Sequence, residues 1–231
     1  MNVAVIPARG GSKRIARKNV RAFAGRPLIE RAIETARSSG CFDSILVSTD
    51  DAQIASIASA AGARVPFMRP AELSDDFTGT IPVIRHAVQW LVEHDEAPEF
   101  VCCLYPAAVL LEAAALADAL ALMRTSGRDF CFGAVAYPHP IQRALVIGHD
   151  GTASMLDPAQ AQRRTQDLQP TFHDAGQFCW GSASAFLRGG SPLVEGAAAL
   201  VLSRLRVVDI DTEEDWQHAE ALYAALGAAG K

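Results

Sequence analysis

The chain of 231 residues is half hydrophobic and carries a formal net charge of −5, which suits one substantial α/β core with or without a small appended lobe. The acidic balance argues against general nucleic-acid binding, and we expect neither a membrane span nor a secretory signal. The five cysteines include no C-x-x-C pair, so we expect buried thiols in a cytoplasmic protein.

A basic loop follows the first predicted strand, Val3–Ile6, which ends at Pro7. The loop reads A-R-G-G-S-K-R-I-A-R-K-N-V-R and holds six cations within thirteen positions: Arg9, Lys13, Arg14, Arg17, Lys18 and Arg21. Gly10 and Gly11 would let backbone N–H groups approach an anion without an intervening Cβ. The spacing matches neither the Walker loop nor the G-x-G-x-x-G fingerprint, so the pattern favours a polyphosphate site of another kind over a merely solvated basic loop.

Strands and helices alternate along the chain, which favours a mostly parallel, doubly wound sheet. Further strands are predicted at Ile45–Ser48, Phe100–Leu104 and Leu205–Ile210, and helices at Leu28–Ser38, Asp51–Ala61, Thr80–Glu93, Glu112–Thr125 and Glu213–Leu226. Asp50 or Asp51 suits the N-cap of the second helix, and Gly62 its C-terminal end. Ligands gather at the carboxyl ends of parallel strands, so Arg9, Asp50 and Tyr105 should share one crevice.

A polar cluster precedes the helix predicted from Thr80. It consists of Ser74, Asp75, Asp76 and Thr78, together with Thr80 at the start of the helix. These side chains could contact a nucleotide or cap the helix, and the residues alone do not decide between the two roles.

The composition changes between residues 137 and 180, where proline, histidine, glutamine and arginine accumulate and no long helix is predicted. We expect an inserted β-rich arm here within a single domain of residues 1–231, serving sugar recognition, dimerisation or both. Gln142, Arg143, Arg163 and Arg164 offer donors that suit a carboxylated sugar. The H-D-A-G-Q run at 173–177 is more typical of a turn that contacts substrate than of a metal site, because no second histidine lies at ligand spacing.

Asp209 and Asp211 form a D-I-D pair near the end of the chain. On a strand, side chains two positions apart point to the same face, so both carboxylates could hold one Mg²⁺. The alternative is that Asp211 and Thr212 only cap the last helix, where Thr212 and Asp215 form a T-x-x-D pattern similar to a capping box.

Four motifs, in order along nearly the whole chain, resemble the cytidylyltransferases that activate nonulosonic acids: I-P-A-R-G-G-S-K-R-I-A-R-K-N, V-S-T-D-D, S-D-D-F and D-I-D-T-E-E-D-W. The runs Pro140–Leu145 and Gln166–Phe178 are most similar to members that act on pseudaminic acid. Members that act on sialic acid typically show P-N-G where this chain has D-A-G at 174–176, and Q-P-T-S-P near Tyr105. Ala16 stands where a proline is usual in the family.

The resemblance implies a Rossmann-like nucleotide-diphospho-sugar transferase fold and a homodimer whose arm reaches the neighbour's site. It implies CTP contacts from Arg9, Lys13, Lys18 and Asn19. We also expect nucleotide contacts from Ala8, Gly10, Asp75, Thr80 and Tyr105. We expect sugar contacts from Gln142, Arg143, Arg164, His173, Asp174 and Gln177. We assign catalytic roles to Arg9, Lys13 and Asp211, and Mg²⁺ ligation to Asp209 and Asp211.

The reaction implied is attack by the anomeric hydroxyl of the sugar on the α-phosphorus of CTP, which releases pyrophosphate and forms a CMP-sugar for a bacterial surface glycan or flagellin. Three alternatives remain open from the sequence. The acceptor could be sialic or legionaminic acid, the protein could be a metal-dependent glycosyltransferase, or it could bind nucleotide without catalysis.

Overall fold

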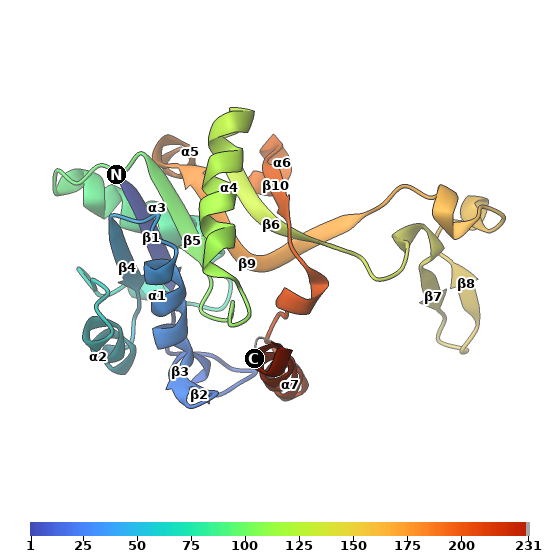
Figure 1. Ribbon diagram of the computed structural model, residues 1–231, viewed down its shortest axis with the longest axis horizontal. Helices are drawn as coiled ribbons and strands as arrows, with labels where there is room; N and C mark the ends of the chain where they lie inside the picture. The colour runs from blue at the N-terminus through green and yellow to red at the C-terminus, as the bar shows by residue number, and fades with distance from the viewer. Residues whose placement is uncertain (230–231) are drawn as a thin grey trace.

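A six-stranded sheet forms the centre of the computed structural model, which describes residues 1–229 (Figure 1). The strand order is β10-β6-β9-β5-β1-β4. β1 pairs in parallel with β4 and β5, β10 pairs in parallel with β6, and β9 runs antiparallel between β5 and β6. The strands are β1 Asn2–Pro7, β4 Ser44–Ser48, β5 Phe100–Leu104, β6 Phe130–Ala136, β9 Phe172–Ser182 and β10 Ala198–Val201. The α/β class with a mostly parallel sheet is therefore confirmed.

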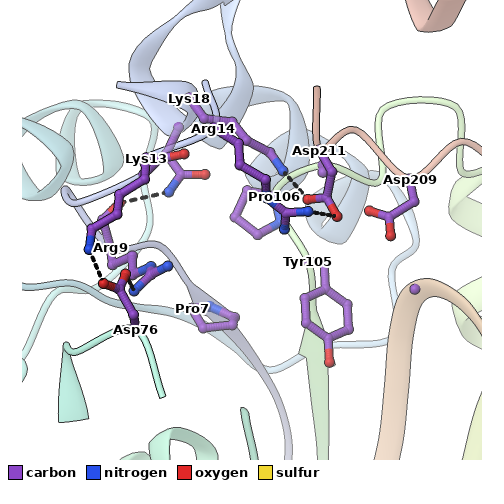
Figure 2. Close-up of a pocket in the computed structure, with 14 residues that line it drawn as sticks. Pro7, Arg9, Lys13, Arg14, Lys18, Asp76, Tyr105, Pro106, Asp209 and Asp211 are labelled. Atoms are coloured by element: carbon purple, nitrogen blue, oxygen red, sulfur yellow. Dashed lines mark hydrogen bonds and ion pairs between the residues drawn. The ribbon is translucent and has the colours of Figure 1, made fainter. Parts of the chain in front are cut away.

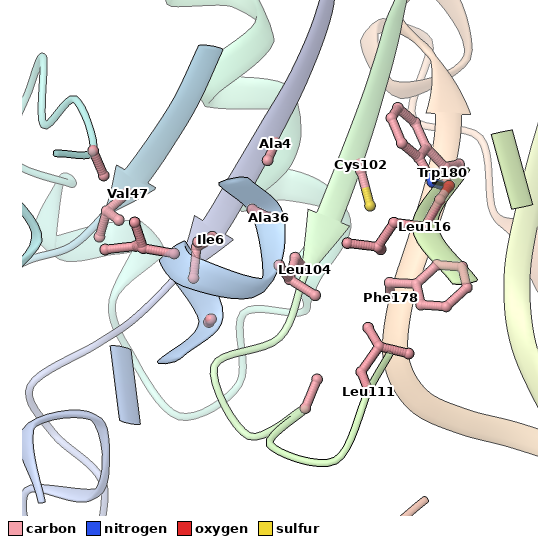
Figure 3. Close-up of a cluster of buried hydrophobic side chains, with 14 of the residues drawn as sticks. Ala4, Ile6, Ala36, Val47, Cys102, Leu104, Leu111, Leu116, Phe178 and Trp180 are labelled. Atoms are coloured by element: carbon pink, nitrogen blue, oxygen red, sulfur yellow. Dashed lines mark hydrogen bonds between the residues drawn. The ribbon is translucent and has the colours of Figure 1, made fainter. Parts of the chain in front are cut away.

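Helices cover both faces of this sheet, so its central strands are apolar on both sides. The helices are α1 Leu28–Ser38, α2 Ala52–Ala60, α3 Thr80–Glu93, α4 Ala113–Ser126, α5 Ala183–Leu187, α6 Pro192–Glu195 and α7 Glu213–Ala229. Ala4 and Ile6 of β1 join the cluster under α1 and α4, with Leu116 and Trp180 (Figure 3). Val3 lies on the opposite face in the cluster under α3 and α5. No helix within residues 1–229 is long and apolar enough to cross a membrane.

A third apolar cluster lies outside the sheet and joins the two ends of the chain. The short hairpin of β2 Ala22–Phe23 and β3 Arg26–Pro27 contributes Phe23, which meets Trp216 of α7 edge to face at 5.6 Å. Ile15 of the basic loop and Ile210 are buried in the same cluster. Burying such side chains stabilises the fold by about 1.5–3 kcal/mol each, and here it fixes the basic loop against the segment before α7.

The predicted helix caps are confirmed. Asp51 is the N-cap of α2, and its side chain accepts hydrogen bonds from the backbone N–H groups of Gln53 and Ile54. Gly62 follows the end of α2 with a φ of +86°, a backbone conformation that glycine adopts without strain. At α7, the Asp215 carboxylate accepts from the Thr212 N–H at 2.7 Å, and the Thr212 hydroxyl accepts from the Asp215 N–H at 3.2 Å.

The strand predicted at Leu205–Ile210 is wrong. A 3-10 turn, η6 Arg204–Arg206, begins there with the Ser203 hydroxyl as its cap, and residues 207–212 continue without regular structure. β10, which the sequence pattern did not indicate, occupies the position beside β6. The alternating hydrophobic pattern has another cause, since Val208 and Ile210 are buried in the third apolar cluster.

The segment 137–180 divides into two parts in the structure. Residues up to 171 project away from the sheet and carry a small hairpin of β7 Leu145–Ile147 and β8 Ala153–Met155 (Figure 1). Residues 172–180, by contrast, belong to β9 in the central sheet. We call the projecting segment 137–171 the arm.

Replacing Asp51 should destabilise the protein through α2. We expect Asp51→Ala to lower the free energy of unfolding by about 1 kcal/mol at neutral pH, because the cap is lost. The Arg17 guanidinium beside it lowers the Asp51 pKa to about 2, so its ionic contribution is fully present above about pH 5 and is lost as the pH falls toward 2. Urea unfolding at several pH values measures both effects.

Asp51→Asn distinguishes the effect of the helix cap from that of the charge, because the amide oxygen still accepts hydrogen bonds but carries no charge. The stability difference between wild type and Asp51→Asn should shrink as the solution is acidified below about pH 5. A difference that stays constant with pH would show that the Asp51 charge does not stabilise the fold.

Candidate functional site

A cavity of about 740 Å³ lies at the carboxyl ends of β1 and β5 (Figure 2). Its walls are formed by the basic loop, by the start of the loop that follows β5, by β9, and by the segment before α7. Its lining residues are Pro7, Arg9, Ser12, Lys13, Arg14, Lys18, Asn19, Asp76, Tyr105, Pro106, Ala107, Gly176, Asp209 and Asp211. The volume is within the usual range for small-molecule sites, and the predicted crevice at this edge of the sheet contains Arg9 and Tyr105 but not Asp50.

The six cations of the basic loop divide into two functional groups. Arg9, Lys13, Arg14 and Lys18 line the cavity. Arg17 instead pairs with Asp51, while Arg21 forms a two-pronged contact with Glu213 at 2.6 and 2.7 Å and lies 4.1 Å from the Trp216 ring centre. Asn19 donates a hydrogen bond to the backbone oxygen of Arg9 at 3.0 Å. Two of the cations therefore hold the loop in place and four face the cavity.

One wall of the cavity is organised by Asp76. Its carboxylate pairs with Arg9 at 2.9 Å and with Lys13 (Figure 2). Asp75 points elsewhere, because its Oδ1 accepts from the N–H groups of Phe77 and Thr78 in a local turn. Asp76 therefore lines the cavity at the position predicted for its neighbour Asp75. The alternative that this cluster caps α3 is wrong, because the N-cap is Gly79 and no side chain bonds there.

The opposite wall holds the D-I-D pair. Arg14 pairs with Asp211 at 2.8 Å, and Lys18 lies 3.6 Å from the other Asp211 oxygen and donates to the backbone oxygen of Ile210 (Figure 2). Desolvation by the cavity walls and the charge of Asp211 raise the pKa of Asp209. The strand argument for this pair is wrong, since residues 207–212 form no strand, yet both carboxylates line the same cavity.

The structure explains the glycine at position 10 by the lack of space for a side chain, not by the approach of an anion to its N–H group. Its N–H already donates to the Asp50 carboxylate at 2.9 Å, and a Cβ at this position would lie 2.6 Å from Asp51 Oδ2 and 2.9 Å from Asp51 Cβ. Gly11, by contrast, has open space around its Cα. Gly10 and the buried Ala8 do not line the cavity, so their expected nucleotide contacts have no counterpart in this arrangement.

Thr80 does not line the cavity itself but contacts Tyr105, which does. The Tyr105 hydroxyl donates to Thr80 Oγ1 at 3.2 Å, and this contact fixes the ring that lines the cavity. Its neighbour Cys103 and burial raise the pKa of Tyr105 well above its ordinary value. Tyr105 is therefore a neutral group at physiological pH.

The residues expected to contact sugar lie in three different places. Gln142, Arg143 and Arg164 are on the arm and bond within it, to Gln169, Thr165 and Asp167 respectively. His173 and Asp174 line a smaller, second cavity. Gln177 is buried, and its amide donates to the backbone oxygens of Ala175 and Val208.

The Gln177 amide therefore ties β9 to the segment that carries Asp209, while its Oε1 is buried without a hydrogen-bond partner in the part of the chain that the structure describes. Seven cavity residues were not among the expected contacts: Pro7, Ser12, Arg14, Asp76, Pro106, Ala107 and Gly176. Each of these residues lies in or beside a run that resembles the family pattern, so the motifs indicated the right part of the chain. Residue type alone did not separate the lining positions from their neighbours.

The chain is similar to known proteins over most of its length. The profile of the cytidylyltransferase family matches residues 3–185. The chain is 39% identical over 222 residues to the pseudaminic acid cytidylyltransferase of Campylobacter jejuni, covering 96% of each chain, and 29% identical to the CMP-N,N'-diacetyllegionaminic acid synthase of Legionella pneumophila, covering 95% of each. Its fold resembles that of CMP:2-keto-3-deoxy-manno-octonic acid synthetase complexed with CTP, with a TM-score of 0.71, 17% identity and coverage of 97% and 98%.

Gly10→Ala tests whether the position of the basic loop matters for nucleotide binding. Because the new Cβ would meet the capped and paired Asp51, we expect the loop to shift, with a destabilisation of about 1–3 kcal/mol and weaker CTP binding in calorimetry. Gly11→Ala is the matched control, since a Cβ there meets nothing within 4 Å. Equal CTP affinity in the two variants would contradict this account of the loop.

Proposed function

The chain belongs to the cytidylyltransferase family, and from that membership we propose that it transfers CMP from CTP to pseudaminic acid and releases pyrophosphate. The observation that carries the proposal is the cavity that four cations of one loop line together with the carboxylates of Asp209 and Asp211. Such a site can hold an anionic polyphosphate at one wall and a cation at the other.

The choice of pseudaminic acid is supported by similarity along the whole chain. The identity of 39% to an enzyme named for that acid exceeds the 29% to a legionaminic acid synthase at equal coverage. The P-I-Q-R-A-L and D-A-G runs support the same acceptor.

The chain's own cations hold and orient the triphosphate in this proposal. Arg9 and Lys13 exchange Asp76 for phosphate oxygens and stabilise the departing pyrophosphate, and Arg14 leaves Asp211 in the same way. Arginine offers forked contacts to phosphate, and lysine a point charge. The reaction then depends on positioning and charge stabilisation, with the anomeric hydroxyl of the acid attacking the α-phosphorus.

Asp209 and Asp211 fit a Mg²⁺ ion, which we propose as the cofactor. The Asp209 carboxylate forms no ion pair or hydrogen bond with residues 1–229, although it lies beside Asp211 at the cavity wall. No group of three or more metal-ligating side chains exists in that part of the chain. Mg²⁺ commonly binds through one or two carboxylates plus waters and substrate phosphates, and when bound it would neutralise phosphate charge.

A homodimer is also part of the proposal. The arm projects from the core and exposes apolar side chains, with Leu145 60%, Ile147 63% and Leu156 67% exposed. Exposed apolar clusters of this kind typically mark protein contacts. A second copy of the chain is the partner that the family resemblance favours, in a cytoplasmic enzyme.

Pyrophosphate release tests the function directly. We expect the purified protein with CTP and Mg²⁺ to release pyrophosphate when pseudaminic acid is added, and to release far less with sialic or legionaminic acid. Release with another acid alone would overturn the acceptor, and absence of release with every acid would overturn the enzyme. A glycosyltransferase would produce no pyrophosphate from CTP.

Asp211→Ala should reduce turnover by roughly a hundredfold or more with the fold intact, because the metal-binding pair is lost. The Mg²⁺ concentration needed for half-maximal rate should rise as well. Glu214→Gln is the control, since Glu214 is exposed on α7 and does not line the cavity. Circular dichroism checks the fold, and near-normal turnover in Asp211→Ala would exclude the assignment of this residue.

A further inference from the structure

The second cavity adjoins the first at Asp209. It has a volume of about 310 Å³ and is lined by residues that include Pro138, His173, Asp174, Arg204 and Asp209. Asp209 is the one residue that lines both cavities among their described walls. A ligand in the second cavity would therefore meet a nucleotide in the first at this carboxylate.

Arg204 is the cation of the second cavity. It lies in the η6 turn, is exposed, and forms no ion pair or hydrogen bond through its side chain with residues 1–229. Arg206 in the same turn is different, because it pairs with Glu112 at 2.7 Å and does not line this cavity. The guanidinium of Arg204 is thus available for an anionic ligand, which it can grip through two parallel hydrogen bonds.

The walls around Arg204 are otherwise fixed. The His173 ring lies 4.7 Å from the Tyr137 ring, and its Nδ1 contacts the backbone oxygen of Asp174 at 2.8 Å. The arm arginines, by contrast, are occupied within the arm.

The chemistry of the acceptor matches this arrangement. In a cyclic 2-keto sugar acid the carboxylate is attached to the same carbon as the anomeric hydroxyl. A residue that recognises the carboxylate must therefore lie close to the reacting centre, and on the side away from the leaving pyrophosphate. The cations of the basic loop line the first cavity and not the second, while Asp209 lines both.

We propose that the second cavity binds the sugar acid and that Arg204 is the ligand for its carboxylate. The inference rests on the proposed function and names the site of its second substrate. Arg204 also offsets the repulsion between the acid's carboxylate and Asp209. A neutral sugar lacks the carboxylate and gains nothing from Arg204, so this residue selects acids.

The test is a steady-state comparison of the full-length wild type with Arg204→Ala, Arg204→Lys and Arg206→Ala, by pyrophosphate release. We expect Arg204→Ala to raise KM for pseudaminic acid by roughly tenfold or more while KM for CTP stays unchanged. Arg204→Lys should recover part of this loss, because it restores the charge without the fork. Arg206→Ala should keep the wild-type KM for the acid.

Three results would overturn the inference. One is a wild-type KM for the acid in Arg204→Ala, and another is an equal rise in Arg206→Ala, which would trace the effect to the η6 turn. A loss of acid binding in Arg143→Ala with none in Arg204→Ala would assign the carboxylate to the arm instead.

Calorimetric titration of pseudaminic acid into each variant, with CMP present, gives a readout that needs no turnover. If the wild type binds the acid and Arg204→Ala binds it more weakly, the inference is supported. This holds even if no pyrophosphate is released, and in that case only the proposed function fails. No difference in acid binding between the two proteins, including no binding by either, overturns the inference.

Discussion

The packing of Ile15 against Ile210 and Trp216 is the contact on which the site depends. The basic loop has little regular structure of its own, with a single short 3-10 turn at Lys18–Val20. Without an apolar anchor, nothing in its local conformation would direct its cations toward Asp209 and Asp211. The cluster buries one side chain from the loop and several from the C-terminal segment, so the hydrophobic effect positions a charged site that electrostatics alone would leave mobile.

The ion pairs inside the cavity are suited to exchange. The side chains of Lys13 and Arg14 are 78% and 67% exposed, and those of Asp76 and Asp211 are about one-third exposed. Ion pairs this accessible contribute about 0–1 kcal/mol, so giving them up for phosphate or metal costs little. Arg17 and Asp51 differ, because that pair is combined with a helix cap and holds the loop. The basic loop thus forms two kinds of ion pair, those that a ligand can replace and those that hold the loop in place.

The sequence predicted part of the regular core, since β6, β9 and β10 of the central sheet were not among the expected strands. It predicted the walls of the site less well. Helices α1 and α3 and strand β5 have the predicted bounds, because periodic apolar residues decide them. β9 was missed because its first half is polar and Gly176 has a positive φ of 61°. Leu205–Ile210 alternates like a strand, but Val208 and Ile210 pack with Trp216 of α7 in the third apolar cluster, and Leu205 is exposed. Asp75 and Asp76 are chemically identical neighbours, and only the turn made by Asp75 reveals which one faces the cavity.

The contact between the loop and the C-terminal segment also has a consequence for biosynthesis. Arg21 and Glu213 are 192 residues apart, and the third apolar cluster spans the same separation. At a translation rate of about 5–20 residues per second, the basic loop leaves the ribosome roughly 10–40 s before Asp211 and Glu213. During that interval Arg14, Lys18 and Arg21 lack the carboxylates with which they pair in the folded protein, whereas Asp51 and Asp76, the partners of the other loop cations, are already made. The complete cavity can therefore form only near the end of synthesis, after Asp209 and Asp211 have left the ribosome.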